Sequence, residues 1–313
     1  MNIQAILANV PVPNDIPLPL PAAEWVLVAL LVVSFLMHIL FINLMIGGTF
    51  LSLWAEIKGL KNNDYDILAQ EVSKTITVNK SLAVVLGVAP LLTVNVLYTV
   101  YFYSANSLTG DLWISVVPLV TIAFILLYWR KYQWHRFVNK KYISIILGAI
   151  PAAIFLFVPL IFLTNVNLMQ FPEKWVEIEG FTSAMMLSNV FPRYFHFLTA
   201  SFAITGIFMF GYMRRNKYSV EMIFNNFKKH TLLKKWYKLA FFATLLQLVF
   251  GPLVFFTLPW KGVNWTLAYI VIAGIIFAFT AMYLLWRDLK SDSLKLGKHF
   301  MKVVLAMTIT VPF

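Results

Sequence analysis

Residues 23–56 form one long apolar stretch, AEWVLVALLVVSFLMHILFINLMIGGTFLSLWAE. Its only acidic residues, Glu24 and Glu56, stand at its two ends, and no Lys or Arg interrupts it. About 20 apolar residues are enough for an α-helix to cross the ~30 Å hydrocarbon core of a bilayer, so this stretch predicts a transmembrane helix. Because the run is longer than one crossing needs, we expect the helix to tilt or to project beyond the membrane.

The whole chain has the composition of a polytopic membrane protein. Of its 313 residues, 60% are hydrophobic and only 12% are charged. A soluble domain of this length needs more polar surface. Further apolar runs lie near 81–106, 112–130, 143–167, 190–213, 236–258, 265–286 and 300–313, the last being the shortest. We therefore predict an all-α integral membrane protein with about eight transmembrane helices, forming one domain over 1–313 in which 1–22 is an interfacial lead-in.

Charged residues are concentrated in the connections between these runs. Lys and Arg crowd the first, third, fifth and seventh connections, whereas the second has no base and the fourth is acidic. By the positive-inside rule, the basic connections lie in the cytoplasm and the N-terminus lies outside. The net charge of +12 is then explained by topology and by contact with membrane lipid, and nucleic acid is not an expected partner. We expect the protein in the bacterial inner (cytoplasmic) membrane.

Two histidines stand inside apolar runs. His38 lies in residues 36–41, LMHILF, and His196 lies in residues 194–198, YFHFL. An imidazole in hydrocarbon is costly unless a partner holds it, so both are candidate functional residues. The chain has no cysteine, which excludes a covalent c-type haem site and cysteine-ligated iron–sulfur clusters on it. Haem iron is a frequent partner for such a histidine.

The surroundings of each histidine allow two interpretations. Arg193 lies one turn from His196 toward the outer surface, where its guanidinium could pair with haem propionates. Alternatively, Arg193 reaches for the interface and His196 bonds a neighbouring helix. His38 could likewise bond a backbone carbonyl or an Asn or Thr of another helix, and Gly47-Gly48 permits close approach of either a cofactor or a helix. Small residues on the face of His196 leave room for a macrocycle or for helix packing; they are Thr199, Ala200, Ala203 and Gly206.

Four segments resemble cytochrome bd quinol oxidase subunit I, in that family's order and spacing over residues 38–213. They are 37–48 (MHILFINLMIGG), 87–90 (GVAP) with 103–106 (YSAN), 164–172 (TNVNLMQFP) and 191–196 (FPRYFH). In that family, a histidine of the first helix ligates a high-spin haem and a histidine of the fifth ligates a low-spin b haem near the outer face. The resemblance therefore implies that His38 and His196 ligate haem iron, with one or two b haems bound.

The chain departs from this family where oxygen is reduced. Residues 114–129 contain none of the glutamates that the family carries on its third helix. Residues 265–272 lack the methionine that is the second ligand of the low-spin haem, and Met282 lies toward the wrong end of its run. The family's Gly-Arg-Gln-Pro-Trp signature and its long quinol-binding loop are also missing. The resemblance thus implies a divergent, shortened member that no longer reduces oxygen.

Three functions follow from these observations. The first is a haem-b-binding subunit of a respiratory complex, in which His196, His38 and Arg193 bind the cofactor and electrons pass between the quinone pool and an outer-face partner such as a c-type cytochrome. The second is a cofactor-free membrane anchor or quinone-site subunit of a periplasmic oxidoreductase, which the missing methionine favours. The third, a transporter, is disfavoured by the lack of intramembrane carboxylates. No catalytic residue is predicted, and whether the chain is itself an enzyme stays open.

Overall fold

Helices make up nearly all of the structure. The computed structural model describes residues 19–137, 140–259, 263–291 and 296–310, and no strand occurs among them. Six of the described helices are long and apolar enough to cross a membrane, and a seventh span is reached if a bent pair of helices counts as one. The prediction of an all-α multi-pass membrane protein is confirmed, with six or seven complete spans in the described part where about eight were expected.

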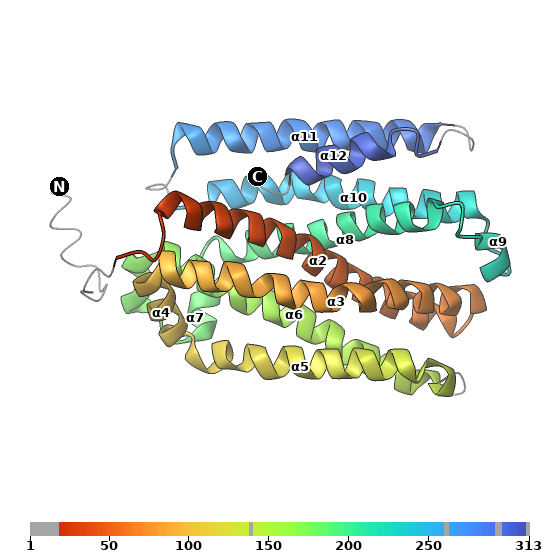
Figure 1. Ribbon diagram of the computed structural model, residues 1–313, viewed down its shortest axis with the longest axis horizontal. Coiled ribbons are helices and arrows are strands. Elements are labelled where there is room, and N and C mark those ends of the chain that lie inside the picture. Colours follow the sequence, from red (N-terminus) through yellow and green to blue (C-terminus); the bar gives the residue numbers. More distant parts are fainter. Residues whose placement is uncertain (1–18, 138–139, 260–262, 292–295, 311–313) are drawn as a thin grey trace.

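Long helices form a bundle and short ones lie mostly at its ends (Figure 1). The long helices are α2 (Glu24–Gly59), α3 (Asn63–Leu97), α5 (Gly110–Tyr132), α6 (Lys141–Gln170), α8 (Val190–Arg214), α10 (Lys229–Phe256) and α11 (Trp265–Lys290). The shorter elements are α4 (Thr99–Leu108), η1 (Trp134–Phe137), η2 (Pro172–Glu177), α7 (Phe181–Met185), α9 (Val220–Ile223) and α12 (Phe300–Thr310).

Helices α2 and α3 form a hairpin longer than a membrane span. Their 36 and 35 residues extend over about 54 and 52 Å at 1.5 Å per residue, so α2 is long enough for either the tilt or the projection expected of the first run. Residues 63–80, which the charge pattern placed in a connection, are the first half of α3. The Asn62 side chain begins this helix by accepting a hydrogen bond from the Asp64 backbone N–H at 3.0 Å.

The second apolar run, 81–106, does not form one straight span as predicted. Helices α3 and α4 meet at a bend of 107°, and α4 lies across the end of the bundle (Figure 1). Neither glycine nor proline stands at the bend, so the sequence carries no local signal for it. Tertiary contacts hold α4 in place: Phe102 and Ala105 are buried, and Asn106 bonds Asn165 of α6.

The two ends of the chain also differ from expectation or lie partly outside the described residues. The predicted eighth span, 300–313, contains the 11-residue helix α12, which at about 16 Å covers roughly half of the hydrocarbon core. Residues 311–313 lie outside the described residues. In the expected interfacial lead-in, residues 19–22 are exposed and non-helical, and 1–18 are not described.

The basic connections meet at one end of the bundle, here called the basic end. It contains the ends of α2, α5, α8 and α11 and the starts of α3, α6, α10 and α12. Asp64 accepts hydrogen bonds there from the backbone amides of Asn225 and Asn226 at 2.8 and 2.7 Å, which ties the α2–α3 turn to the chain before α10. The positive-inside rule predicts that the basic end is cytoplasmic. The opposite end, which carries α4 and α7, is called the outer end.

Candidate functional site

His38 lies in the interface between α2 and α3. Its Nδ1 is 2.7 Å from the backbone oxygen of Ala83, and because a carbonyl only accepts, Nδ1 is the donor. Gly87 lies one turn further along α3 and meets the ring, since a Cβ at this position would stand 2.7 Å from His38 Cε1. The interpretation that His38 bonds a backbone carbonyl is confirmed. This bond leaves Nε2 as the acceptor nitrogen of the neutral ring.

His196 lies in the matching place between α8 and α10. Its ring faces Gly251, where a Cβ would stand 3.6 Å from Cε1 and 3.8 Å from Nδ1. Nδ1 is buried and has no hydrogen-bond partner within the described residues. A buried polar atom without a partner costs about 1–3 kcal/mol. His38 Nδ1 is hydrogen-bonded to a neighbouring helix. Within the described part of the chain, His196 Nδ1 is not.

The two histidines lie at the same depth in the bundle. Helices α2 and α8 both run from the outer end to the basic end and pack against each other (Figure 1). Ser201 Oγ donates to Asn43 Oδ1 at 2.8 Å, and these two residues are 158 positions apart. His38 and His196 are also 158 positions apart. Each therefore stands five residues, or about 7 Å, from this hydrogen bond toward the outer end.

Close packing of small residues sets this register. Gly47 of α2 lies against the backbone oxygen of Ser201 and the hydroxyl of Thr205, and Gly48 lies against Ile76 of α3. A side chain at either glycine would collide with the neighbouring helix. Of the two uses expected for the Gly47-Gly48 pair, the structure shows helix packing.

The small face of α8 is largely occupied by α10. Ala203 is buried, and a Cβ on Gly206 would stand 2.9 Å from the backbone oxygen of Trp236. Thr199 donates to the backbone of its own helix. Helix packing therefore explains the part of this face that lies toward the basic end.

Arg193 stands one turn from His196 toward the outer end. Its Nη2 donates to Gln170 Oε1 of α6 at 3.2 Å. No carboxylate pairs with Arg193 in the described part of the chain. The Gln170 amide is neutral and does not compensate the positive charge of Arg193. In the described part of the chain the guanidinium is therefore able to bind an anion.

Two segments of the family resemblance touch each other at the outer end. Asn165 Nδ2 donates to Asn106 Oδ1 at 2.5 Å, and Trp175 Nε1 donates to the Leu168 backbone oxygen at 2.9 Å. Asn167 is fully buried, and neither its side-chain nitrogen nor its oxygen has a partner among the described residues. The contacts explain Asn106 and Asn165 by packing, whereas Asn167 has no such explanation.

The two histidines differ in how well they fit a haem ligand. A metal-ligating histidine usually donates its other ring N–H to a carbonyl or carboxylate. His38 makes this bond through Nδ1, which leaves Nε2 for a metal, whereas His196 Nδ1 is buried and has no such partner among the described residues. The described residues contain no cluster of three or more His, Cys, Asp or Glu able to hold a metal ion. That finding concerns ions ligated by protein alone, whereas porphyrin supplies most ligands of haem iron.

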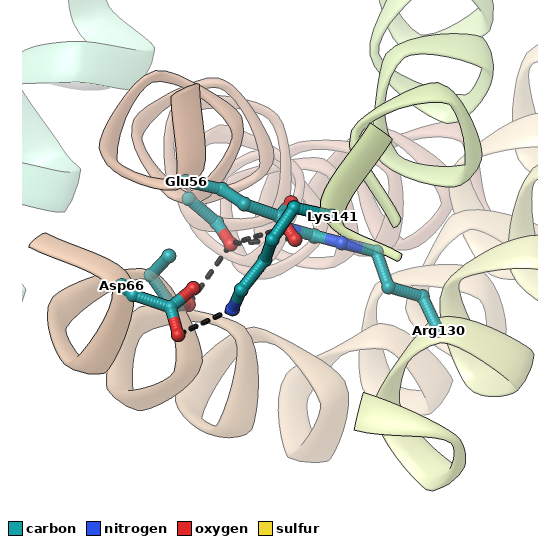
Figure 2. A network of polar contacts seen from close by, with 6 residues as sticks. Glu56, Asp66, Arg130 and Lys141 are labelled. Carbon is teal, nitrogen blue, oxygen red and sulfur yellow. Dashed lines mark hydrogen bonds and ion pairs between the residues drawn. The ribbon is translucent and has the colours of Figure 1, made fainter. Parts of the chain in front are cut away.

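The basic end contains an ion pair that the sequence analysis missed (Figure 2). Glu56 of α2 and Arg130 of α5 are paired, with exposed fractions of 0% and 1%. Arg130 also donates to Ser52 Oγ at 3.3 Å, and a second pair, Asp66 with Lys141, lies nearer the rim. The sequence placed Glu56 and Arg130 at span ends, where charges usually meet water. The long α2–α3 hairpin extends past this level, because residues 63–80, which the charge pattern placed in a connection, belong to α3.

This buried pair keeps unused hydrogen-bonding capacity. Glu56 Oε1, Arg130 Nε and the hydroxyl of Ser144 in α6 are buried without a partner in the residues that the structure describes. The Arg130 guanidinium packs 5.0 Å from the Trp134 ring centroid and against Gly148, where a Cβ would be 3.2 Å from Arg130 Cζ. Buried polar atoms of this kind are places where ordered water binds. We assign this network to the structure of the basic end.

No protein-family profile matches the chain, and no curated protein matches it. The resemblance of the four segments stays a prediction, and the functional argument rests on the residues themselves.

Proposed function

We propose that this multi-pass membrane protein is a haem-b-binding subunit of an electron-transfer complex of the bacterial inner membrane. His196 and His38 would hold the haem iron. The observation that carries the proposal is the buried, unpartnered Nδ1 of His196 at the same depth as His38. A buried ring nitrogen without a hydrogen bond costs stability unless another group compensates for it.

The residues have distinct parts in this proposal. The bound haem supplies one-electron transfer. His38 orients its ring through the Nδ1 bond to Ala83 and presents Nε2, and Gly87 and Gly251 keep side chains away from the two rings. Arg193, near the outer end, would pair with an anionic haem propionate. Electrons would then pass between the quinone pool and a c-type cytochrome or another redox subunit at the outer face.

A second candidate function is a cofactor-free membrane anchor or quinone-site subunit. The observation that favours it is the completeness of the packing around His38. Its Nδ1 is bonded to Ala83, and its ring fills the space beside Gly87. His38 therefore has a structural role that needs no haem.

Optical spectra of the purified protein distinguish the two candidates. We expect a b-type band in the reduced-minus-oxidised spectrum and at least one b haem per chain by pyridine haemochrome analysis. His196→Ala and His38→Ala should each lower the haem content, whereas the matched control His135→Ala, an exposed histidine of η1, should not. A haem content of zero in the wild-type protein, purified from cells that make haem, rejects the first candidate and leaves the anchor function.

A further inference from the structure

Three aromatic rings from separate elements meet at the basic end. Tyr65 of α3 packs edge-on against Trp54 of α2, with ring centroids 5.5 Å apart, and against Phe227, which precedes α10, at 5.2 Å. Trp54 is 45% exposed, so the cluster opens onto the outside of the bundle. These contacts join the α2–α3 hairpin to the start of α10.

Two lysines flank the same cluster. Lys58 Nζ is 4.3 Å from the Trp54 ring centroid and 5.5 Å from that of Tyr65. Lys235 Nζ is 5.3 Å from the Tyr65 centroid and 4.6 Å from that of Phe227, and it donates to the Tyr65 hydroxyl at 3.3 Å. Both ammonium groups thus lie within cation–π distance of one ring, no more than about 11 Å apart. We call these five residues the lysine–aromatic site.

The two positive charges have no anionic partner in the described part of the chain. Neither lysine forms an ion pair there. The nearby acids are already engaged: Glu56 with Arg130, Asp66 with Lys141, and Asp64 with two backbone amides. Rings attract the ammonium groups only weakly when these are exposed. An anion between the two lysines would relieve their mutual repulsion.

The depth of the site indicates where such an anion comes from. Trp54 lies one turn inside Lys58 on α2, on the membrane side, and Ile57 and Leu60 beside them are 49% and 43% exposed. Exposed tryptophan is typical of the membrane interface, where headgroups meet acyl chains. Basic pockets between transmembrane helices on the cytoplasmic side bind anionic lipid headgroups.

We propose that the lysine–aromatic site binds the phosphate headgroup of an anionic phospholipid. Lys58 and Lys235 pair with the phosphate oxygens. The Tyr65 hydroxyl accepts a hydrogen bond from Lys235 and donates a hydrogen bond to a phosphate oxygen. The acyl chains lie along the exposed face of Trp54 and Ile57. The site thereby fastens the start of α10 to the α2–α3 hairpin in a lipid-dependent manner.

Lipid titrations of the full-length, delipidated protein in detergent test this proposal. Phosphatidylglycerol should bind more tightly than phosphatidylcholine in native mass spectrometry and should raise the apparent melting temperature. A lysine near an anionic membrane surface contributes about fivefold in affinity, so Lys58→Gln with Lys235→Gln should weaken phosphatidylglycerol binding about 20- to 30-fold. The matched control is Lys217→Gln, which replaces an exposed lysine at the same end of the bundle and should leave binding unchanged.

A second readout covers the case in which the double variant folds poorly. Brominated phosphatidylglycerol should quench tryptophan fluorescence in the wild-type protein, and Trp54→Phe should lose part of that quenching while Trp286→Phe retains it. Equal binding of the two lipids, unchanged affinity in the double variant, or an equal effect of water-soluble glycerol phosphate would overturn the proposal. None of these measurements depends on haem.

Discussion

The α2–α3 and α8–α10 hairpins repeat one arrangement with different chemistry. In each, a histidine at the same depth rests against a glycine of the following helix. In α2–α3 the ring is bonded to Ala83, and the basic end is closed by the buried Glu56–Arg130 pair. In α8–α10, ring stacking of Phe210 on Tyr237, with centroids 3.7 Å apart, supports the packing, and His196 Nδ1 has no partner among the described residues. His38 thus contributes to structure whatever else it does, whereas no hydrogen bond within the described part of the chain explains His196 Nδ1.

We expect the strongest destabilisation from loss of the buried ion pair that joins Glu56 of the first hairpin to Arg130 of α5. Arg130→Met should destabilise the protein by about 3–5 kcal/mol, because it leaves the Glu56 carboxylate buried without its partner. The double variant Glu56→Leu with Arg130→Met should recover most of that loss. Thermal unfolding in detergent measures both. A double variant as unstable as the single one would mean that the pair matters for more than charge compensation.

The two glycines should respond differently to alanine. A Cβ at Gly87 would stand 2.7 Å from the His38 ring, whereas one at Gly251 would make ordinary van der Waals contact with His196 at 3.6 Å. We expect Gly87→Ala to cost about 1–3 kcal/mol because it overpacks this contact. Gly251→Ala should stay within about 0.5 kcal/mol of the wild type. Equal melting temperatures for the two variants would contradict the difference between the hairpins.

Phenylalanine at the two histidine positions separates structural from functional use. In protein prepared without haem, His38→Phe should lose about 0.5–1.5 kcal/mol with the hydrogen bond to Ala83. His196→Phe should be neutral or stabilising, because it removes a buried nitrogen that has no partner in the described residues. Chemical unfolding of the two variants side by side gives the answer. A clear destabilisation by His196→Phe would show that His196 has a structural bond after all.

The smallest expected effect concerns the polar link between the hairpins, outside the membrane spans. Tyr218 donates to Glu71 Oε2 at 2.9 Å, and burial together with the Glu71 charge raises the pKa of the Tyr218 hydroxyl well above its usual value. This contribution to stability is complete below the unfolded pKa of about 10 and is lost as the pH rises above it. Tyr218→Phe should cost about 1 kcal/mol at neutral pH and should flatten the alkaline loss of stability. An unchanged alkaline profile would assign that loss to other groups.

Hydropathy alone predicted the membrane class and most of the spans, because a helix that crosses a membrane is a continuous run of apolar residues in the sequence. It failed where tertiary contacts decide the outcome. The bend between α3 and α4 has no glycine or proline, and it is held by contacts such as Asn106 with Asn165. Glu56 and Arg130 looked like span ends because their burial depends on residues 63–80 continuing as helix. On α8, the small residues on the face of His196 that lie toward the basic end could equally have lined a cofactor site. The structure shows that α10 packs against them.

The sequence alone identified the two candidate histidines, because burying an imidazole in an apolar helix costs free energy in any fold. Their equal depth was not visible, since it depends on the Gly47 contact that sets α2 against α8. The alternative in which His38 bonds a carbonyl was also stated from the sequence, but the choice of Ala83 required the structure.

Haem content measured for His196→Phe shows whether His196 binds haem. Wild-type protein and His196→Phe, purified side by side from haem-replete cells, should both show a cooperative thermal unfolding transition. We expect b haem in the wild type and the loss of at least one haem per chain in His196→Phe, measured by pyridine haemochrome analysis. Equal haem content in the two proteins, or none in either, would contradict this expectation.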